Sequence, residues 1–150
     1  MRVVIPLRAL RVDELLAAIG EKTPAPASGA AAALTGALAA ALTELAAQFA
    51  GNDADVALAR ELAVELVRLG DEDAVVYEAF MADRNEQTRA EIVRVPEEIA
   101  ARADEVATLA ERTADRLSSS VVGDAHSAVE LARASARVAR GLARLNSSGS

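Results

Sequence analysis

Apolar residues recur every three or four positions along most of the chain, which is the period of an α-helix rather than of a strand. Leu15, Leu16 and Ile19 form such a stripe in a short helix predicted over residues 12–19, and Gly20 is a natural end for it. The seven residues that follow contain Pro24 and Pro26, which disfavour a helix and predict an extended loop.

The segment from Ser28 to Ala50 has a helical pattern on two faces and very little charge. One face carries small residues and the other leucines, namely Gly29, Ala33, Gly36 and Ala40, and Leu34, Leu38, Leu42 and Leu45. Residues 23–43 are uncharged over the length of a membrane span, but small residues dominate them and suit close helix packing better than lipid. We therefore expect a buried helix and no membrane association. Because 150 residues can hardly surround such a helix, the pattern predicts a homodimer or higher homo-oligomer with this helix at or beside the interface.

Three further helices are predicted after a turn at residues 51–53. Leucines at positions 58, 62, 66 and 69 mark an amphipathic helix that we expect to continue to Ala82, with a bend near Gly70. The polar residues 83–91 are expected to form a connection, and Pro96 to start a helix that ends near residue 117. Asp124 can cap a last helix that ends near residue 145, and residues 146–150 are predicted to be disordered.

These elements predict an all-α fold, a bundle of five to six helices in one domain that spans residues 1–150. Apolar residues make up 52% of the chain but aromatic residues only 2%, so the core must come from close packing of small side chains.

Charge and composition exclude several classes of function. The net charge is −7 and basic residues alternate with acidic ones, which argues against nucleic acid as the principal partner. Without Cys and with a single His, the chain lacks the usual zinc ligands, and we expect no metal site. The first sixteen residues have no long apolar run of the kind found in secretory signals, so we expect a cytoplasmic protein.

The segment Thr23-Pro24-Ala25-Pro26-Ala27-Ser28-Gly29 is the most specific local signal. A rigid loop that enters a helix N-terminus exposes unpaired backbone amides, which favour an anionic or carbonyl oxygen. The alternative is that this loop is only a rigid connection between two helices.

With this loop, four later motifs follow one another in a characteristic order: Gly36-Ala37-Leu38, Asp71-Glu72-Asp73-Ala74 with Tyr77, Val95-Pro96, and Gly123-Asp124-Ala125. Their order and spacing resemble the cyclodeaminase domain of formiminotransferase-cyclodeaminase and the related bacterial methenyltetrahydrofolate cyclohydrolases. The chain departs from that pattern in two places. Ala27-Ser28-Gly29 replaces a run of glycines, and residues 83–87 do not reproduce an Arg-Leu-Pro-Lys-like loop.

The resemblance implies an all-helical dimer that acts on a folate one-carbon unit. It either deaminates 5-formiminotetrahydrofolate or hydrolyses 5,10-methenyltetrahydrofolate, with no cofactor beyond the tetrahydrofolate substrate. The two departures leave an alternative, a non-catalytic folate-binding or structural oligomerisation module that kept the fold and lost the reaction.

Both reactions centre on an amidinium-like carbon. A carboxylate could stabilise the positive charge of this carbon or deprotonate the water that attacks it. The resemblance assigns this catalytic role to Asp73, Asp71 and Tyr77. Asp73 and Tyr77 lie four residues apart on one helix face while Asp71 points elsewhere, so at most one carboxylate shares the site with Tyr77. A solvated acidic cluster beside Gly70 is the alternative reading of these residues.

The expected substrate-binding residues come from the proline loop and from the start of the last helix: Thr23, Pro24, Pro26, Ser28, Gly29, Asp124 and His126. Helix capping alone would explain Asp124, and a lone His is often structural. Four arginines, at positions 133, 137, 140 and 144, line one face of the last helix. They could bind the glutamate tail of a folate or pair with carboxylates of the preceding helix.

Overall fold

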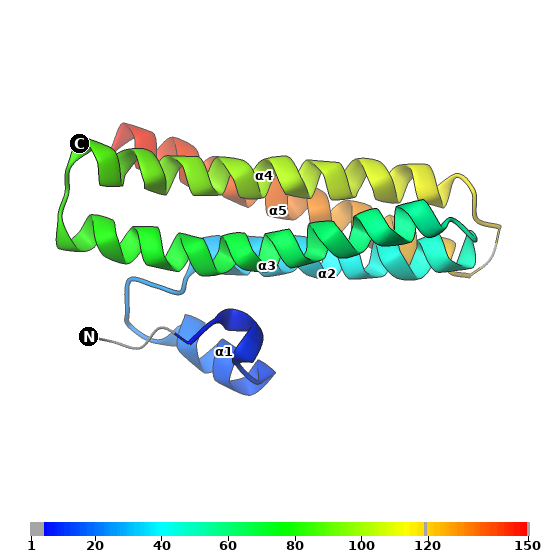
Figure 1. The fold of residues 1–150 in the computed structure, drawn as a ribbon, viewed down its shortest axis with the longest axis horizontal. Coiled ribbons are helices and arrows are strands. Elements are labelled where there is room, and N and C mark those ends of the chain that lie inside the picture. Colours follow the sequence, from blue (N-terminus) through cyan, green and yellow to red (C-terminus); the bar gives the residue numbers. More distant parts are fainter. Residues whose placement is uncertain (1–4, 119, 150) are drawn as a thin grey trace.

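Four long helices that alternate in direction form the body of the molecule, in a computed structural model that describes residues 5–118 and 120–149 (Figure 1). The elements are η1 (Leu7–Ala9), α1 (Val12–Gly20), α2 (Ser28–Phe49), α3 (Asp53–Ala82), α4 (Glu86–Ala114) and α5 (Val122–Ser148). The described ranges leave out residues 1–4, 119 and 150. These include the start of the segment considered for a secretory signal and the end of the tail predicted to be disordered. The described residues contain no strand, so the all-helical prediction is confirmed.

Helix α2 is the core helix, and it packs against α3, α4 and α5. A Cβ atom on Gly36 would lie 2.9 Å from Ser135 Oγ and 3.1 Å from Leu66 Cδ1, so three helices meet where this residue has no side chain. The Ser135 hydroxyl donates a hydrogen bond of 2.6 Å to the carbonyl of Ala32, which joins α5 to α2. By length and composition α2 could also span a membrane, but half of its most apolar window is buried inside the bundle.

The leucine face of α2 differs from the expectation that both faces are buried. Leu38 is 65% exposed, Leu45 39% and Phe49 65%, whereas Gly36 and Ala40 on the small-residue face are buried. The other long helices pack on the small-residue side, so Leu38, Leu45 and Phe49 stay uncovered within one chain. Leu34 and Leu42 are half-buried, and Leu42 packs against the core. Helix α5 also exposes an apolar series at intervals of seven residues, Leu131, Val138 and Leu145.

Helix α3 is continuous through Gly70, as predicted. A Cβ atom at this position would lie 3.1 Å from both Ala33 Cβ and Leu7 Cδ1. Gly70 therefore provides the space in which α2 and η1 approach α3.

Residues 83–85 form the predicted connection, but the prediction for residues 86–96 was wrong, because α4 begins at Glu86 and Pro96 lies inside it. Asn85 caps the helix, since its side chain accepts a 2.9 Å hydrogen bond from the Thr88 amide and the Thr88 hydroxyl accepts one from the Asn85 amide. This reciprocal pair starts a helix in a polar stretch without an apolar signal.

The ends of α5 also differ from prediction. The helix begins at Val122 with Asp124 in its first turn rather than as a cap, and it continues to Ser148 instead of ending near residue 145. The Asn146 side chain donates a 2.7 Å hydrogen bond to the Ile92 carbonyl, and Arg89 bonds the Gly149 carbonyl. These contacts with α4 hold residues 146–149, which were predicted to be disordered, in place.

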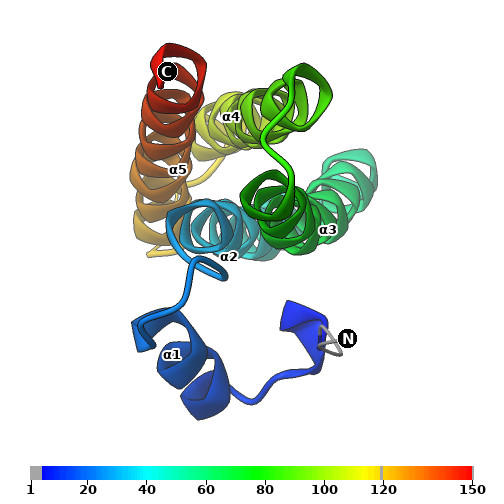
Figure 2. The same ribbon diagram turned by 90° about the vertical axis from the view of Figure 1, so that its left-hand side faces the viewer.

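Helix α1 stands apart from the four-helix body (Figures 1 and 2). It buries none of its side chains, and Val12 and Leu16 are 73% and 66% exposed. Of the predicted stripe only Leu16 is exposed, whereas Leu15 and Ile19 are half-buried. Val12 and Leu16 thus add to the uncovered apolar surfaces on α2 and α5.

Candidate functional site

A small pocket of about 170 Å³ lies at the end of the bundle where α2 begins and α5 ends. The proline loop and the first turn of α2 form one wall, and α3, α4 and α5 form the others. The lining residues are Pro24, Ala25, Ala27, Ser28 and Gly29, then Asp73 and Tyr77, then Pro96, and finally Leu142 and Asn146. Five of these, Pro24, Ser28, Gly29, Asp73 and Tyr77, are among the site residues predicted from the sequence.

The Asp73 carboxylate packs directly against the backbone of Gly29. A Cβ atom on Gly29 would lie 2.0 Å from Asp73 Oδ2 and 2.3 Å from Asp73 Cγ, a distance that no side chain tolerates. Gly29 is thus the glycine that remains of the run expected from the resemblance, and it stands where the carboxylate meets the helix.

Burial raises the pKa of Asp73 from its ordinary value of 3.8 to about 6. Desolvation disfavours the charged carboxylate, and no basic side chain offsets it in the regions that the structure describes. A carboxyl group with a pKa near neutrality is suited to accept and return a proton.

The first turn of α2 faces the same pocket without a side-chain cap. Ala27 occupies the N-cap position and makes no side-chain hydrogen bond, and Ser28 is the first residue of the helix. Uncapped amides at a helix N-terminus carry partial positive charge. The pocket therefore combines a proton acceptor with hydrogen-bond donors.

Pro96 and Asn146 are pocket residues that the sequence analysis missed. A proline inside a helix has no N–H for the carbonyl four residues earlier, which here is that of Ile92. The Asn146 amide nitrogen donates to that carbonyl at 2.7 Å. A proline within a helical pattern and an Asn near the end of a later helix were the available signals.

An aromatic and cationic stack supports Tyr77. The ring centroid of Tyr77 is 6.5 Å from that of Phe80, which also lies on α3. The guanidinium of Arg89, on α4, lies 5.3 Å from the Phe80 centroid. Arg89 also bonds the Gly149 carbonyl, so one cation contacts both α3 and the end of α5. The stack fixes the α3 face that carries Tyr77.

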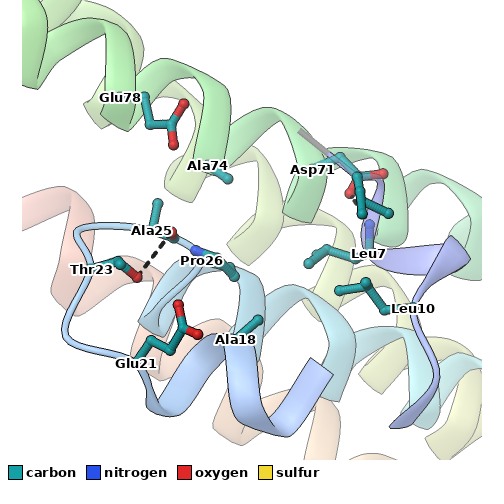
Figure 3. A pocket seen from close by; sticks show the side chains of 11 residues that line it. Leu7, Leu10, Ala18, Glu21, Thr23, Ala25, Pro26, Asp71, Ala74 and Glu78 are labelled. Atoms are coloured by element: carbon teal, nitrogen blue, oxygen red, sulfur yellow. Dashed lines mark hydrogen bonds between the residues drawn. The ribbon is translucent and has the colours of Figure 1, made fainter. Parts of the chain in front are cut away.

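Asp71 belongs to a neighbouring cavity of about 260 Å³ between the N-terminal segment and α3 (Figure 3). Asp71 Oδ1 accepts a 2.6 Å hydrogen bond from the Leu7 amide, a structural role. Thr23 and Pro26 also line this cavity rather than the pocket of Asp73. The structure thus separates the two carboxylates, as their spacing on the helix suggested.

Asp124 and His126 lie at the opposite end of the bundle. Asn146 lies 22 positions after Asp124 in one continuous helix, which corresponds to roughly 33 Å. His126 lines a shallow depression with residues such as Glu111 and Arg133. Within one chain, the structure does not bring these two predicted residues to the pocket.

The arginine face of α5 pairs partly with α4, as one of the two readings expected. Arg133 forms an ion pair with Glu111, and Arg140 forms one with Asp104. Within residues 5–118 and 120–149, no group of three His, Cys, Asp or Glu side chains is placed to hold a metal ion.

Comparisons with known proteins agree with the fold and with the motifs around the pocket. The model of the formiminotransferase-cyclodeaminase family matches residues 11–149. A crystal structure of formiminotetrahydrofolate cyclodeaminase from Thermotoga maritima superposes with a TM-score of 0.88 at 22% identity, over 93% of this chain and 79% of that one. No curated protein sequence matches significantly. Because the family model extends over nearly the whole chain, including every residue that lines the pocket, the chain belongs to the formiminotransferase-cyclodeaminase family.

Proposed function

We propose that this chain is a folate one-carbon enzyme that deaminates 5-formiminotetrahydrofolate to the methenyl form or hydrolyses 5,10-methenyltetrahydrofolate. The observation that carries the proposal is the Asp73 carboxylate, which is desolvated in a pocket and packed against the uncapped start of α2. Membership of the cyclodeaminase family supports the folate substrate.

In the deamination, N10 of the folate attacks the cationic formimino carbon and forms the new C–N10 bond. Asp73 accepts the proton of N10 and passes it to the departing nitrogen. The C–N bond to that nitrogen breaks, ammonia leaves, and the positive charge remains on the methenyl bridge. The ionised Asp73 also stabilises the cation in both ground states, and Tyr77 offers a hydroxyl to the tetrahedral intermediate.

In the hydrolysis, the oxygen of water attacks the methenyl carbon while Asp73 accepts one proton of that water. This proton passes to N5 as the C–N5 bond breaks, and the second proton of the water is released to solvent. The formyl group remains on N10. Both reactions therefore make the same demand on Asp73, a reversible transfer of one proton.

The size of the pocket favours completion by a second subunit. Ligand pockets are typically about 300–1,000 Å³, whereas the pocket of one chain measures about 170 Å³. The same observation supports the alternative of a non-catalytic module, whose pocket would be too small for turnover. The uncovered apolar surfaces on α1, α2 and α5 supply area for a second copy.

Turnover and binding separate the two functions. The purified protein is mixed with 5-formiminotetrahydrofolate or 5,10-methenyltetrahydrofolate, and formation or decay of the methenyl absorbance is followed. Calorimetric titration with tetrahydrofolate derivatives runs in parallel. An enzyme accelerates one reaction above the uncatalysed rate. Binding without acceleration supports the non-catalytic folate-binding module. The absence of both binding and acceleration supports a purely structural role.

The rate should depend on pH through Asp73. Because the base must be ionised and burial raises its pKa to about 6, we expect the rate to rise with pH through about 6 and to level off above it. The pH profile of kcat/KM, corrected for the uncatalysed reaction, measures this, because kcat/KM reports the pKa values of the free enzyme. A profile flat between pH 5 and 7.5 would contradict the assignment of Asp73 as the base.

We expect the chain to form at least a dimer through the uncovered faces of α2 and α5. Leu38→Glu and Val138→Glu should convert the assembly to monomers, because a charge buried in an apolar interface costs several kcal/mol, while each residue is exposed within one chain. Val64→Glu is the matched control, since Val64 is 71% exposed on α3. Light scattering at micromolar concentration measures the state, and a stable wild-type monomer would disprove the prediction.

The small-residue face is a poor place to test assembly. Gly36→Leu, for example, would place a side chain against Ser135 and Leu66 of the same chain. The replacement would disturb packing between α2, α3 and α5 before any subunit contact.

A further inference from the structure

Pro96 leaves one backbone carbonyl of α4 without its usual helical donor. In a regular helix the N–H of residue 96 would bond the carbonyl of Ile92, and proline has no N–H. The carboxamide of Asn146 supplies that donor from α5, with Nδ2 2.7 Å from the Ile92 oxygen. The contact joins positions 54 residues apart at the wall of the pocket.

This contact fixes the orientation of the Asn146 carboxamide by chemistry. A backbone carbonyl oxygen only accepts hydrogen bonds, so the amide nitrogen and not Oδ1 must face Ile92. Oδ1 is left as the acceptor of this carboxamide, and among the described residues no side chain or amide donates a hydrogen bond to it. Asn146 is partly exposed and lines the pocket together with Asp73 and Tyr77.

We infer that Asn146 is a substrate-positioning residue whose Oδ1 accepts a hydrogen bond from an N–H group of the ligand, with its orientation locked by the carbonyl that Pro96 frees. The inference rests on the proposed folate function. The pterin ring carries N–H groups along its edge, whereas the rest of a folate offers few donors. A fixed acceptor opposite the first turn of α2 therefore selects the pterin end.

The Arg89 contacts support this positioning. Arg89 bonds the Gly149 carbonyl and lies 3.4 Å from the Asn146 carbonyl oxygen, so it holds the last turn of α5 against α4. The backbone that carries Asn146 is thereby held in place independently of its side chain.

The first arm of the test measures the lock without any ligand. Pro96→Ala restores the N–H that can bond the Ile92 carbonyl, so Asn146→Ala should lower the denaturant midpoint less in that background than in the wild type.

Asn146→Asp adds a readout that does not require changing Pro96. Its ionised carboxylate cannot donate to Ile92, so its midpoint should fall at pH 7 and recover at a pH low enough to protonate it. Equal effects of Asn146→Ala in both backgrounds, with no pH-dependent recovery, would overturn the lock.

The second arm measures ligand positioning with two probes, 5-formyltetrahydrofolate and p-aminobenzoylglutamate, the latter lacking the pterin ring. Asn146→Ala should weaken binding of the first by roughly tenfold, the value of one hydrogen bond, and leave the second unchanged. Asn52→Ala is the matched control. Asn52 caps α3 at the other end of the bundle, so its loss should lower stability without changing affinity for either probe.

The outcomes separate the two claims. Wild-type binding of 5-formyltetrahydrofolate that Asn146→Ala leaves unchanged overturns the positioning role and leaves the proposed function standing. Equal weakening of both probes also overturns it, because a merely structural role would act on both. A wild-type protein that binds neither probe overturns the proposed function, and the ligand role of Asn146 with it.

Discussion

Asp73→Asn is expected to abolish measurable turnover while leaving the fold intact. The amide keeps the shape of the carboxylate but can neither carry its negative charge nor accept a proton. Loss of general-base action costs about 10²–10⁴-fold in rate. The charged form of Asp73 is disfavoured by burial at pH 7, so the neutral amide should leave the free energy of unfolding equal or higher. Activity is thus expected to fall without any loss of stability.

Rate measurements and urea unfolding on the same preparation test this pair of effects. Asp71→Asn is the matched control, because Asp71 bonds the Leu7 amide outside the pocket. It should lose some stability and keep its rate. If Asp73→Asn is as active as the wild type, the base lies elsewhere, and Asp124 of a second subunit is the next residue to replace.

The sequence predicted the helices wherever apolar residues recur with the helical period. It failed over residues 86–95, where α4 starts from the Asn85 cap in a polar stretch. Pro96 was read as a helix start because a proline inside a helix loses a hydrogen bond. That loss is offset by Asn146, a residue 50 positions later. A tertiary contact of this kind leaves no local pattern.

The site was predictable to the extent that its residues share one element. Asp73 and Tyr77 face the same pocket because they lie one turn apart on α3. The proline loop and the first turn of α2 share a wall of the pocket because they are continuous in the chain. Asp124 and His126 were predicted to lie in the same site because their motif is recognised from its order along the chain, which does not say in which direction α5 runs through the bundle. Helix α5 enters at the opposite end of the bundle, so its last turn rather than its first turn reaches the pocket.

Gly29→Ala is expected to have the second large effect, because it tests whether the close approach of carboxylate and helix is required. The new methyl group would lie 2.0 Å from Asp73 Oδ2, so the carboxylate must leave its place against α2. We expect the rate to fall by about the same 10²–10⁴-fold as for loss of the base itself. Stability should fall by about 1–3 kcal/mol, the usual cost of overpacking.

A double-variant comparison distinguishes this cause from a general defect of α2. When Asp73 is replaced by Ala, the clash disappears, and Gly29→Ala should then be neutral or stabilise the protein by up to about 1 kcal/mol through its better helix propensity. Gly123→Ala is the matched control. It is likewise the second residue of a long helix, but a Cβ atom there meets nothing within 4 Å. If Gly29→Ala keeps full activity, or destabilises the Asp73→Ala protein as much as the wild type, then contact between Asp73 and the start of α2 does not determine the site.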